Sequence, residues 1–139
     1  VYETPAGRPL DPRKIRLGSL VRVRLLVTTK KSFNYVAISD RLPAGLEPIN
    51  DALATSARAR GGKPSRALLK GIALLSFREL KERGAAFYVD ALPSGEVELA
   101  YLARATVAGR FLRPAARSEA MYDPAAEGRS ATDWVVIRR

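Results

Sequence analysis

The sequence predicts an all-β fold, an antiparallel β-sandwich of about seven strands with one irregular or short-helical insert. Apolar and polar side chains alternate with a period of two through most of the apolar segments, which is the pattern of half-buried strands. Turn signals rich in Gly, Pro and Ser separate these segments. The 139 residues are 47% hydrophobic and 27% charged, which is typical of one globular domain.

The first half of the chain contains the first predicted strands. Residues 1–14 are polar and Pro-rich, and we expect a linker or a first strand there. Residues 21–27 alternate Val or Leu with Arg or Thr, so they predict a half-buried strand. A turn at residues 30–32 leads to residues 33–39, whose aromatic and β-branched side chains predict the hairpin partner of that strand. Residues 42–45, Leu-Pro-Ala-Gly, end it with turn chemistry.

The second half predicts four further strands, at residues 74–80, 85–89, 97–105 and 130–137. The longest of them has one apolar face, formed by Val97, Leu99, Tyr101, Ala103 and Ala105. In the last strand we expect Trp134 and Val136 to share a face, with Trp134 in the core. The short turns between strands favour antiparallel pairing, because parallel pairing needs long crossover connections.

Two segments break the alternation. Residues 51–71 are rich in Ala, Arg and Gly and predict a basic insert, with a short helix possible only at 65–71. Residues 113–129 contain Pro114, Pro124 and Gly128, which favour an irregular loop of about 17 residues. A loop of that length is often functional.

The composition excludes most catalytic chemistry. The chain has no Cys and no His, which removes Cys–His and Ser-His-Asp catalysis, disulfides and zinc or iron–sulfur sites with those ligands. Glu96 and Glu98 lie two apart on one strand, but their face is opposite the apolar face, so we expect solvated charges rather than an acid–base pair. We therefore expect no enzymatic activity, no cofactor and no metal.

The net charge of +10 raises the question of an anionic partner. Residues 1–70 carry 14 basic and 5 acidic side chains, and residues 58–70 carry five basic and no acidic ones. No aromatic side chain interleaves with this basic run to stack on bases. We therefore expect no specific nucleic-acid binding. No apolar run approaches the ~20 residues of a membrane helix, so we expect no membrane insertion by this segment.

Met121 and Tyr122 are an unusual pair within the predicted loop. Met121 is the single Met of the chain. A flexible thioether beside an aromatic ring with one polar tip can fill an irregular apolar contact. The pair could cover the core of this domain, or it could be presented to a partner surface. The Asp123-Pro124 dipeptide favours a turn directly after it.

Four segments in this region are similar to the closing signature of bacterial alpha-2-macroglobulins. They are Tyr101-Leu102-Ala103-Arg104-Ala105-Thr106, Gly109-Arg110-Phe111, Met121-Tyr122-Asp123-Pro124 and Gly128-Arg129-Ser130. Residues 7–12, 21–27 and 40–47, and residues 78–80 leading to 92–95, resemble earlier parts of the same domain. The resemblance covers nearly the whole chain except the basic insert.

This resemblance implies that residues 1–139 form the C-terminal macroglobulin-like domain, a β-sandwich of the fibronectin type III kind, and are a fragment of a larger protein. The family implies a periplasmic protein that traps or inhibits proteases and is anchored in the inner membrane through its N-terminus. The implied partners are the helical thioester domain, the neighbouring macroglobulin domains and the target proteases. In members that carry a thioester, Met121 and Tyr122 would shield it from water, with Tyr101, Arg104, Gly109, Pro124, Gly128 and Arg129 as supporting motif residues. The alternative interpretation is a stand-alone adhesin or cell-surface binding module with the same sandwich fold.

Overall fold

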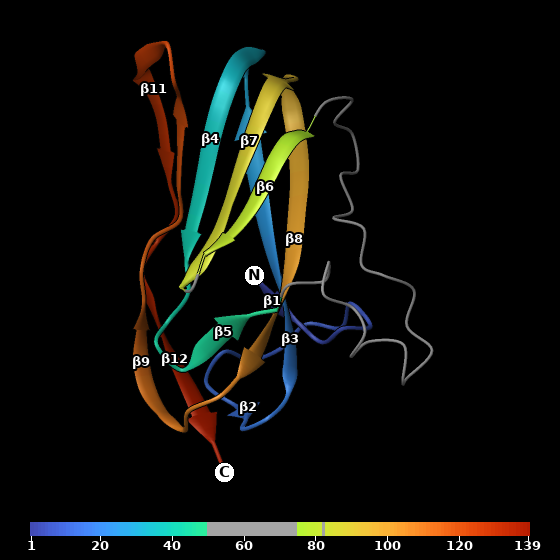
Figure 1. Cartoon of the computed structure of the whole chain (residues 1–139), viewed down its shortest axis with the longest axis vertical. Helices are drawn as coiled ribbons and strands as arrows, with labels where there is room; N and C mark the ends of the chain where they lie inside the picture. Colours follow the sequence, from blue (N-terminus) through green and yellow to red (C-terminus); the bar gives the residue numbers. More distant parts are fainter. Residues whose placement is uncertain (50–74, 82) are drawn as a thin grey trace.

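Twelve strands and no helix form the regular structure of residues 1–49, 75–81 and 83–139, the part of the chain that the computed structural model describes (Figure 1). The basic insert predicted at residues 51–71 lies outside these residues. The strands are β1 (Tyr2–Glu3), β2 (Ile15–Arg16), β3 (Leu20–Thr29), β4 (Phe33–Arg41), β5 (Leu46–Pro48), β6 (Leu75–Lys81), β7 (Gly84–Leu92), β8 (Gly95–Ala105), β9 (Gly109–Arg113), β10 (Arg117–Ala120), β11 (Asp123–Arg129) and β12 (Asp133–Arg138).

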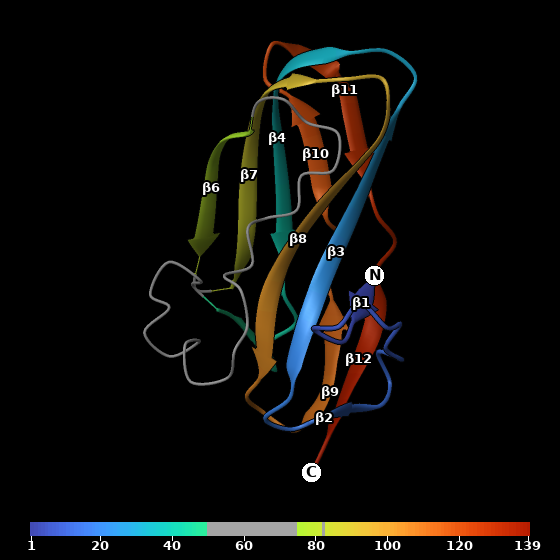
Figure 2. The ribbon, with the colours of Figure 1, turned by 90° about the vertical axis from the view of Figure 1, so that its right-hand side faces the viewer.

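Two sheets form the sandwich, and a small third sheet lies at one end of it (Figures 1 and 2). The first sheet has the order β1-β3-β8-β5, the second β11-β10-β4-β7-β6, and the third β2-β12-β9. All strand pairs in the described residues are antiparallel except β12 with β2, which is parallel. The predicted all-β, antiparallel sandwich is confirmed. The strands outnumber the seven expected, because several are only two to five residues long.

The predicted hairpin between residues 21–27 and 33–39 is wrong. All ten residues of β3 pair with β8, whereas β4 pairs with β7 and β10, so the turn after Thr29 carries the chain from one sheet to the other. The Pro93-Ser94 turn makes the same change of sheet between β7 and β8. Alternation shows which face of a strand is buried, but it does not identify the neighbouring strand.

The core between the sheets follows the predicted alternation. The five predicted inward residues of β8 are all buried: Val97, Leu99, Tyr101, Ala103 and Ala105. Phe87 of β7 lies opposite them, with its ring centroid 6.2 Å from that of Tyr101. The two sheets therefore share one apolar core, to which Leu25 and Val27 of β3 contribute as partly buried side chains.

The prediction for Trp134 is wrong. Val135 and Ile137 of β12 are buried, whereas the Trp134 side chain is 41% exposed and lies under the guanidinium of Arg110, 4.2 Å from its ring centroid. Both alternating sets of this strand are apolar, so the period of two could not choose the buried face.

The third sheet packs on the sandwich where Gly45 has no side chain. A Cβ there would clash with the Phe111 ring and with the Ile137 side chain.

Charged side chains on the outer face of the first sheet form a cluster. Glu96 is exposed, as predicted, but Glu98 is partly buried between Arg22 and Arg24, with N–O distances of 3.1 and 3.4 Å. Glu3 of β1 contacts the same two arginines at 3.4 and 2.9 Å. The cluster therefore joins three neighbouring strands across their outer face.

Candidate functional site

The segment predicted as an irregular loop, residues 113–129, instead contains a β-hairpin. Strands β10 and β11 pair antiparallel, and β10 also pairs with β4, so the hairpin extends the second sheet (Figure 1). Pro124 is tolerated because β11 is the edge strand of that sheet. At Gly128 an added Cβ would lie 2.6 Å from the Ser118 hydroxyl oxygen, so glycine allows close pairing with β10.

Met121 and Tyr122 form the two-residue turn of this hairpin, since Ala120 pairs with Asp123. The Met121 side chain is 46% exposed and that of Tyr122 is 81% exposed. Of the two alternatives open for this pair, covering the domain's own core does not fit this exposure. The pair is presented at one end of the molecule, and the third sheet lies at the opposite end (Figure 1).

Tyr35 of β4 holds this turn in place. The Met121 amide donates a hydrogen bond of 2.9 Å to the Tyr35 carbonyl oxygen. The Tyr122 ring packs edge-to-face on the Tyr35 ring, with 5.5 Å between centroids and an interplanar angle of 81°. Tyr35 itself has φ of 54°, a left-handed conformation that costs a non-glycine residue roughly 1–2 kcal/mol. Its side chain is 50% exposed. We call Tyr35, Met121 and Tyr122 the tip patch.

The tip patch is an exposed, largely apolar cluster. It offers a thioether and two phenol rings, and exposed apolar clusters of this kind mark interaction sites. No group of three or more acidic side chains that could hold a metal ion occurs among the described residues. The sequence singled out Met121 and Tyr122 as candidates but not Tyr35, because nothing in the sequence links Tyr35 to Met121, which is 86 positions away.

The supporting motif residues are dispersed over the domain. Arg104 is exposed on β8 and Gly109 begins β9, whereas Pro124, Gly128 and Arg129 lie on β11 with the tip patch at its start. Tyr101 is buried between the sheets. The structure therefore gathers only part of the motif near Met121 and Tyr122.

Tyr101 has a structural role in the core. Its hydroxyl donates a hydrogen bond of 2.6 Å to Asp40 Oδ2, which joins β8 of one sheet to β4 of the other. Burial raises the pKa of Asp40, although the hydrogen bond from Tyr101 and the positive charge of Arg113 oppose the rise. Burial, reinforced by the charge of Asp40, also raises the pKa of Tyr101.

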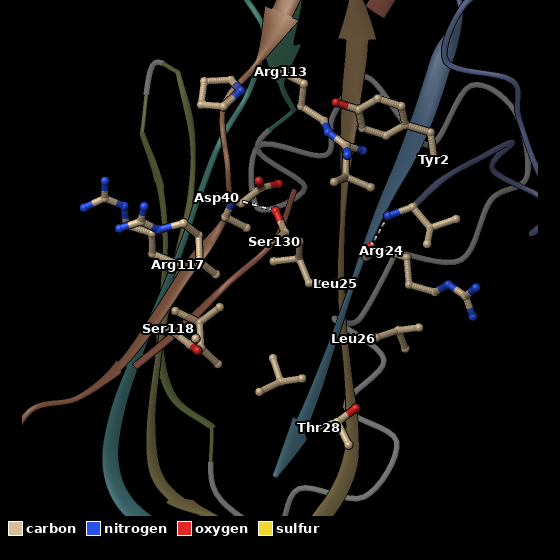
Figure 3. A pocket seen from close by; sticks show the side chains of 18 residues that line it. Tyr2, Arg24, Leu25, Leu26, Thr28, Asp40, Arg113, Arg117, Ser118 and Ser130 are labelled. Atoms are coloured by element: carbon tan, nitrogen blue, oxygen red, sulfur yellow. Dashed lines mark hydrogen bonds between the residues drawn. The ribbon is translucent and has the colours of Figure 1, made fainter. Parts of the chain in front are cut away.

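Asp40 lies at one end of a cleft of about 440 Å³ between β3 and the β10–β11 hairpin (Figure 3). Figure 3 shows Leu25, Leu26 and Thr28 on the β3 side and Arg117 and Ser118 on the opposite side. Arg113 lies beside Tyr2 at the same end as Asp40, with its guanidinium 5.7 Å from the Tyr2 ring centroid.

No helix in the described ranges is long and apolar enough to span a lipid bilayer.

Comparison with known proteins gives consistent matches. The family model described as the bacterial alpha-2-macroglobulin MG10 domain matches residues 2–125. The alpha-2-macroglobulin of Escherichia coli is 33% identical over 138 residues, covering 96% of this chain and 8% of that protein. The alpha-2-macroglobulin homolog of a Nostoc species is 29% identical over 127 residues, covering 91% of this chain and 6% of that protein. The solved structure of Escherichia coli alpha-2-macroglobulin activated by porcine elastase superposes with a TM-score of 0.84 at 28% identity, covering 99% of this chain and 12% of that one. The chain thus spans less than a tenth of the length of these curated relatives.

Proposed function

The chain belongs to the family of bacterial alpha-2-macroglobulin MG10 domains, and we propose that it is the C-terminal domain of a periplasmic protease-trapping protein. In this role the domain is not an enzyme. It packs on neighbouring macroglobulin domains and on the helical thioester domain of the same polypeptide. The full-length polypeptide binds the target proteases and is anchored in the inner membrane through its N-terminus. The relative that was activated by porcine elastase supports a response to proteases.

The tip patch is the part of the domain that we assign to thioester shielding. The observation that carries this proposal is the exposure of Met121 and Tyr122 on a turn that is fixed by Tyr35. A turn that is already ordered loses little conformational entropy when it docks. The thioether and the Tyr122 ring then cover the reactive carbonyl carbon and exclude water, which is the nucleophile of hydrolysis. Protease cleavage elsewhere in the polypeptide removes the cover.

The experiment is the double substitution Met121→Ala and Tyr122→Ala in the full-length polypeptide. We expect the thioester to react with methylamine at least tenfold faster than in the unsubstituted protein, measured as released thiol with a chromogenic thiol reagent. Val107→Ala is the matched control, because Val107 is 50% exposed and apolar but lies outside the hairpin. An unchanged rate in the double variant would contradict the shielding role.

The stand-alone adhesin has no observation of its own in its favour. The family match covers 124 of the 139 residues, and adhesion would require a ligand surface that is independent of a larger polypeptide. Secretion of the chain as a separate protein would support that alternative instead.

A further inference from the structure

A continuous groove runs along the outer edge of β3. The cleft of about 440 Å³ shown in Figure 3 continues into a second cavity of about 240 Å³ toward the tip patch. The two cavities share four lining residues, Val27, Thr28, Ser118 and Gly128. One wall is β3 and the other is the β10–β11 hairpin. We call this combined space the edge groove.

The edge of β3 opposite β8 borders this groove. On its outer side β3 pairs only with β1, through Val23 and Arg22, and Arg24 exchanges two further hydrogen bonds with Val1. From Leu25 to Thr29 no described strand pairs with that edge. Because alternate residues of a strand direct their N–H and C=O groups to the same side, Leu26 and Thr28 present theirs on the edge that Arg24 uses. An unpaired edge of this kind is a template for an added strand.

The inner side chains beside this edge are incompletely covered. Val21 and Val23 are buried where β1 runs beside β3, whereas Leu25 and Val27 on the same face are only partly buried. Both of the latter line the cleft. A strand laid along β3 would shield these two side chains from water, and such burial is favourable.

Charged side chains also occur along the groove. Arg113 lines the cleft at the Asp40 end, whereas Lys30, Glu119 and Glu127 line the cavity near the tip patch. On β10, Arg117 and Glu119 are exposed, and the alternate residues Ser118 and Ala120 face inward. The groove therefore suits an extended segment whose apolar side chains are directed inward, toward Leu25 and Val27.

We propose that the edge groove seats an extended strand from another part of the full-length polypeptide, paired with Leu26 and Thr28 of β3. The occupant is taken from the same polypeptide because such a strand continues the line of β1 along β3, and because the curated relatives are far longer than this chain. Main-chain hydrogen bonds give such an added strand its affinity, and pockets for alternate side chains select its sequence. Five residues of β3 offer a contact about 17 Å long. The proposal does not depend on the shielding role of the tip patch.

Hydrogen–deuterium exchange resolved to single amides tests this pairing in the isolated 139-residue chain and in the full-length protein. We expect the Leu26 and Thr28 amides to exchange at least tenfold more slowly in the full-length protein. The amides of Leu25 and Val27 bond to β8 in both forms and serve as the internal reference. Equal exchange of Leu26 and Thr28 in both proteins would overturn the proposal.

Two further measurements identify the occupant. Thr28→Pro removes the outward N–H without removing a bond to β8, whereas Thr28→Ala keeps that N–H and is the matched control. In the full-length protein, we expect the proline variant to lose the slow exchange of the Leu26 amide and the alanine control to keep it. The thioester of the alanine control should react at the same rate as in the unsubstituted protein. Slow exchange that appears in the isolated chain only at high protein concentration would assign the groove to a second copy and overturn the assignment to the same polypeptide.

Discussion

Replacing Tyr101 with Phe removes one hydroxyl from the centre of the sandwich and keeps the ring. The hydroxyl donates at 2.6 Å to the carboxylate of Asp40, so the lost interaction is a buried hydrogen bond to a charged group. Bonds of that type contribute about 1.5–3 kcal/mol, and the ring still fills its space, so no large cavity term adds to the loss. We expect the free energy of unfolding to fall by about 2 kcal/mol at pH 7, which lowers the Tm by about 8 °C in a domain of this size.

The pH dependence of this loss gives the stronger test. Burial raises the folded-state pKa of Asp40, and the Tyr101 hydrogen bond partly offsets the rise. A carboxyl with a raised folded pKa is most favourable to folding below its unfolded pKa of about 3.9, and this contribution is lost as the pH rises through the folded value. Tyr101→Phe raises the folded pKa further, so its deficit should grow from about 1 kcal/mol at pH 4 to about 2 kcal/mol at pH 7.

Urea unfolding followed by circular dichroism at both pH values provides the measurement. Asp40→Asn with and without Tyr101→Phe completes a double-mutant cycle, in which the Tyr101 deficit should be equal at pH 4 and pH 7. Tyr122→Phe is the exposed control and should change stability by less than about 0.5 kcal/mol. A Tyr101→Phe deficit that is the same at both pH values, or below about 0.5 kcal/mol at pH 7, would refute the assigned role of this hydrogen bond.

Three further substitutions test the packing and the charges. Gly45→Ala places a methyl group against the Phe111 ring and should lower the free energy of unfolding by about 1–3 kcal/mol, which is measured as a lower Tm. An unchanged Tm would show that the third sheet moves to accommodate the methyl group without a loss of stability. Trp134→Ala should cost less than about 1 kcal/mol because the ring is on the surface, whereas a core tryptophan would cost about 3–5 kcal/mol in urea unfolding. Glu98→Gln should cost about 1 kcal/mol at low ionic strength and less in 1 M NaCl; a loss that is independent of salt would contradict an ion-pair origin.

The faces of the long strands were predictable because one alternating set in each strand is apolar and the other is not. Residues 97–105 show this pattern, and their five predicted inward residues are buried. Residues 133–138 do not, since Trp134 and Val136 alternate with Val135 and Ile137, and the choice of face was wrong there. Strand partners were not predictable, because β3 and β4 would show the same alternation in one hairpin as in two sheets.

The sequence could single out Met121 and Tyr122 as candidate residues, but it could not predict their geometry. Met121 and Tyr122 stood out as an apolar pair beside Asp123-Pro124, which favours a turn. The two prolines argued against strands, but Pro114 precedes β10 and Pro124 lies on an edge strand, where a missing N–H costs no ladder bond. Tyr35 could not be found, because its left-handed φ and its ring contact with Tyr122 depend on how β4 and the hairpin pair.

The edge groove and the tip patch share one structural element, the β10–β11 hairpin. This hairpin forms one wall of the groove and carries Met121 and Tyr122 at its end. Four residue pairs between β10 and β4, together with the contacts of the tip with Tyr35, join it to the sandwich. A strand seated in the groove would contact the inner side of β10 at Ser118 and hold the hairpin against β3. The tip, which Tyr35 already holds, would then be restrained further, and the entropy lost on docking would be smaller still. Strand pairing at β3 and thioester shielding by the tip patch are therefore coupled. A substitution that weakens the pairing at β3 should also make the thioester react faster.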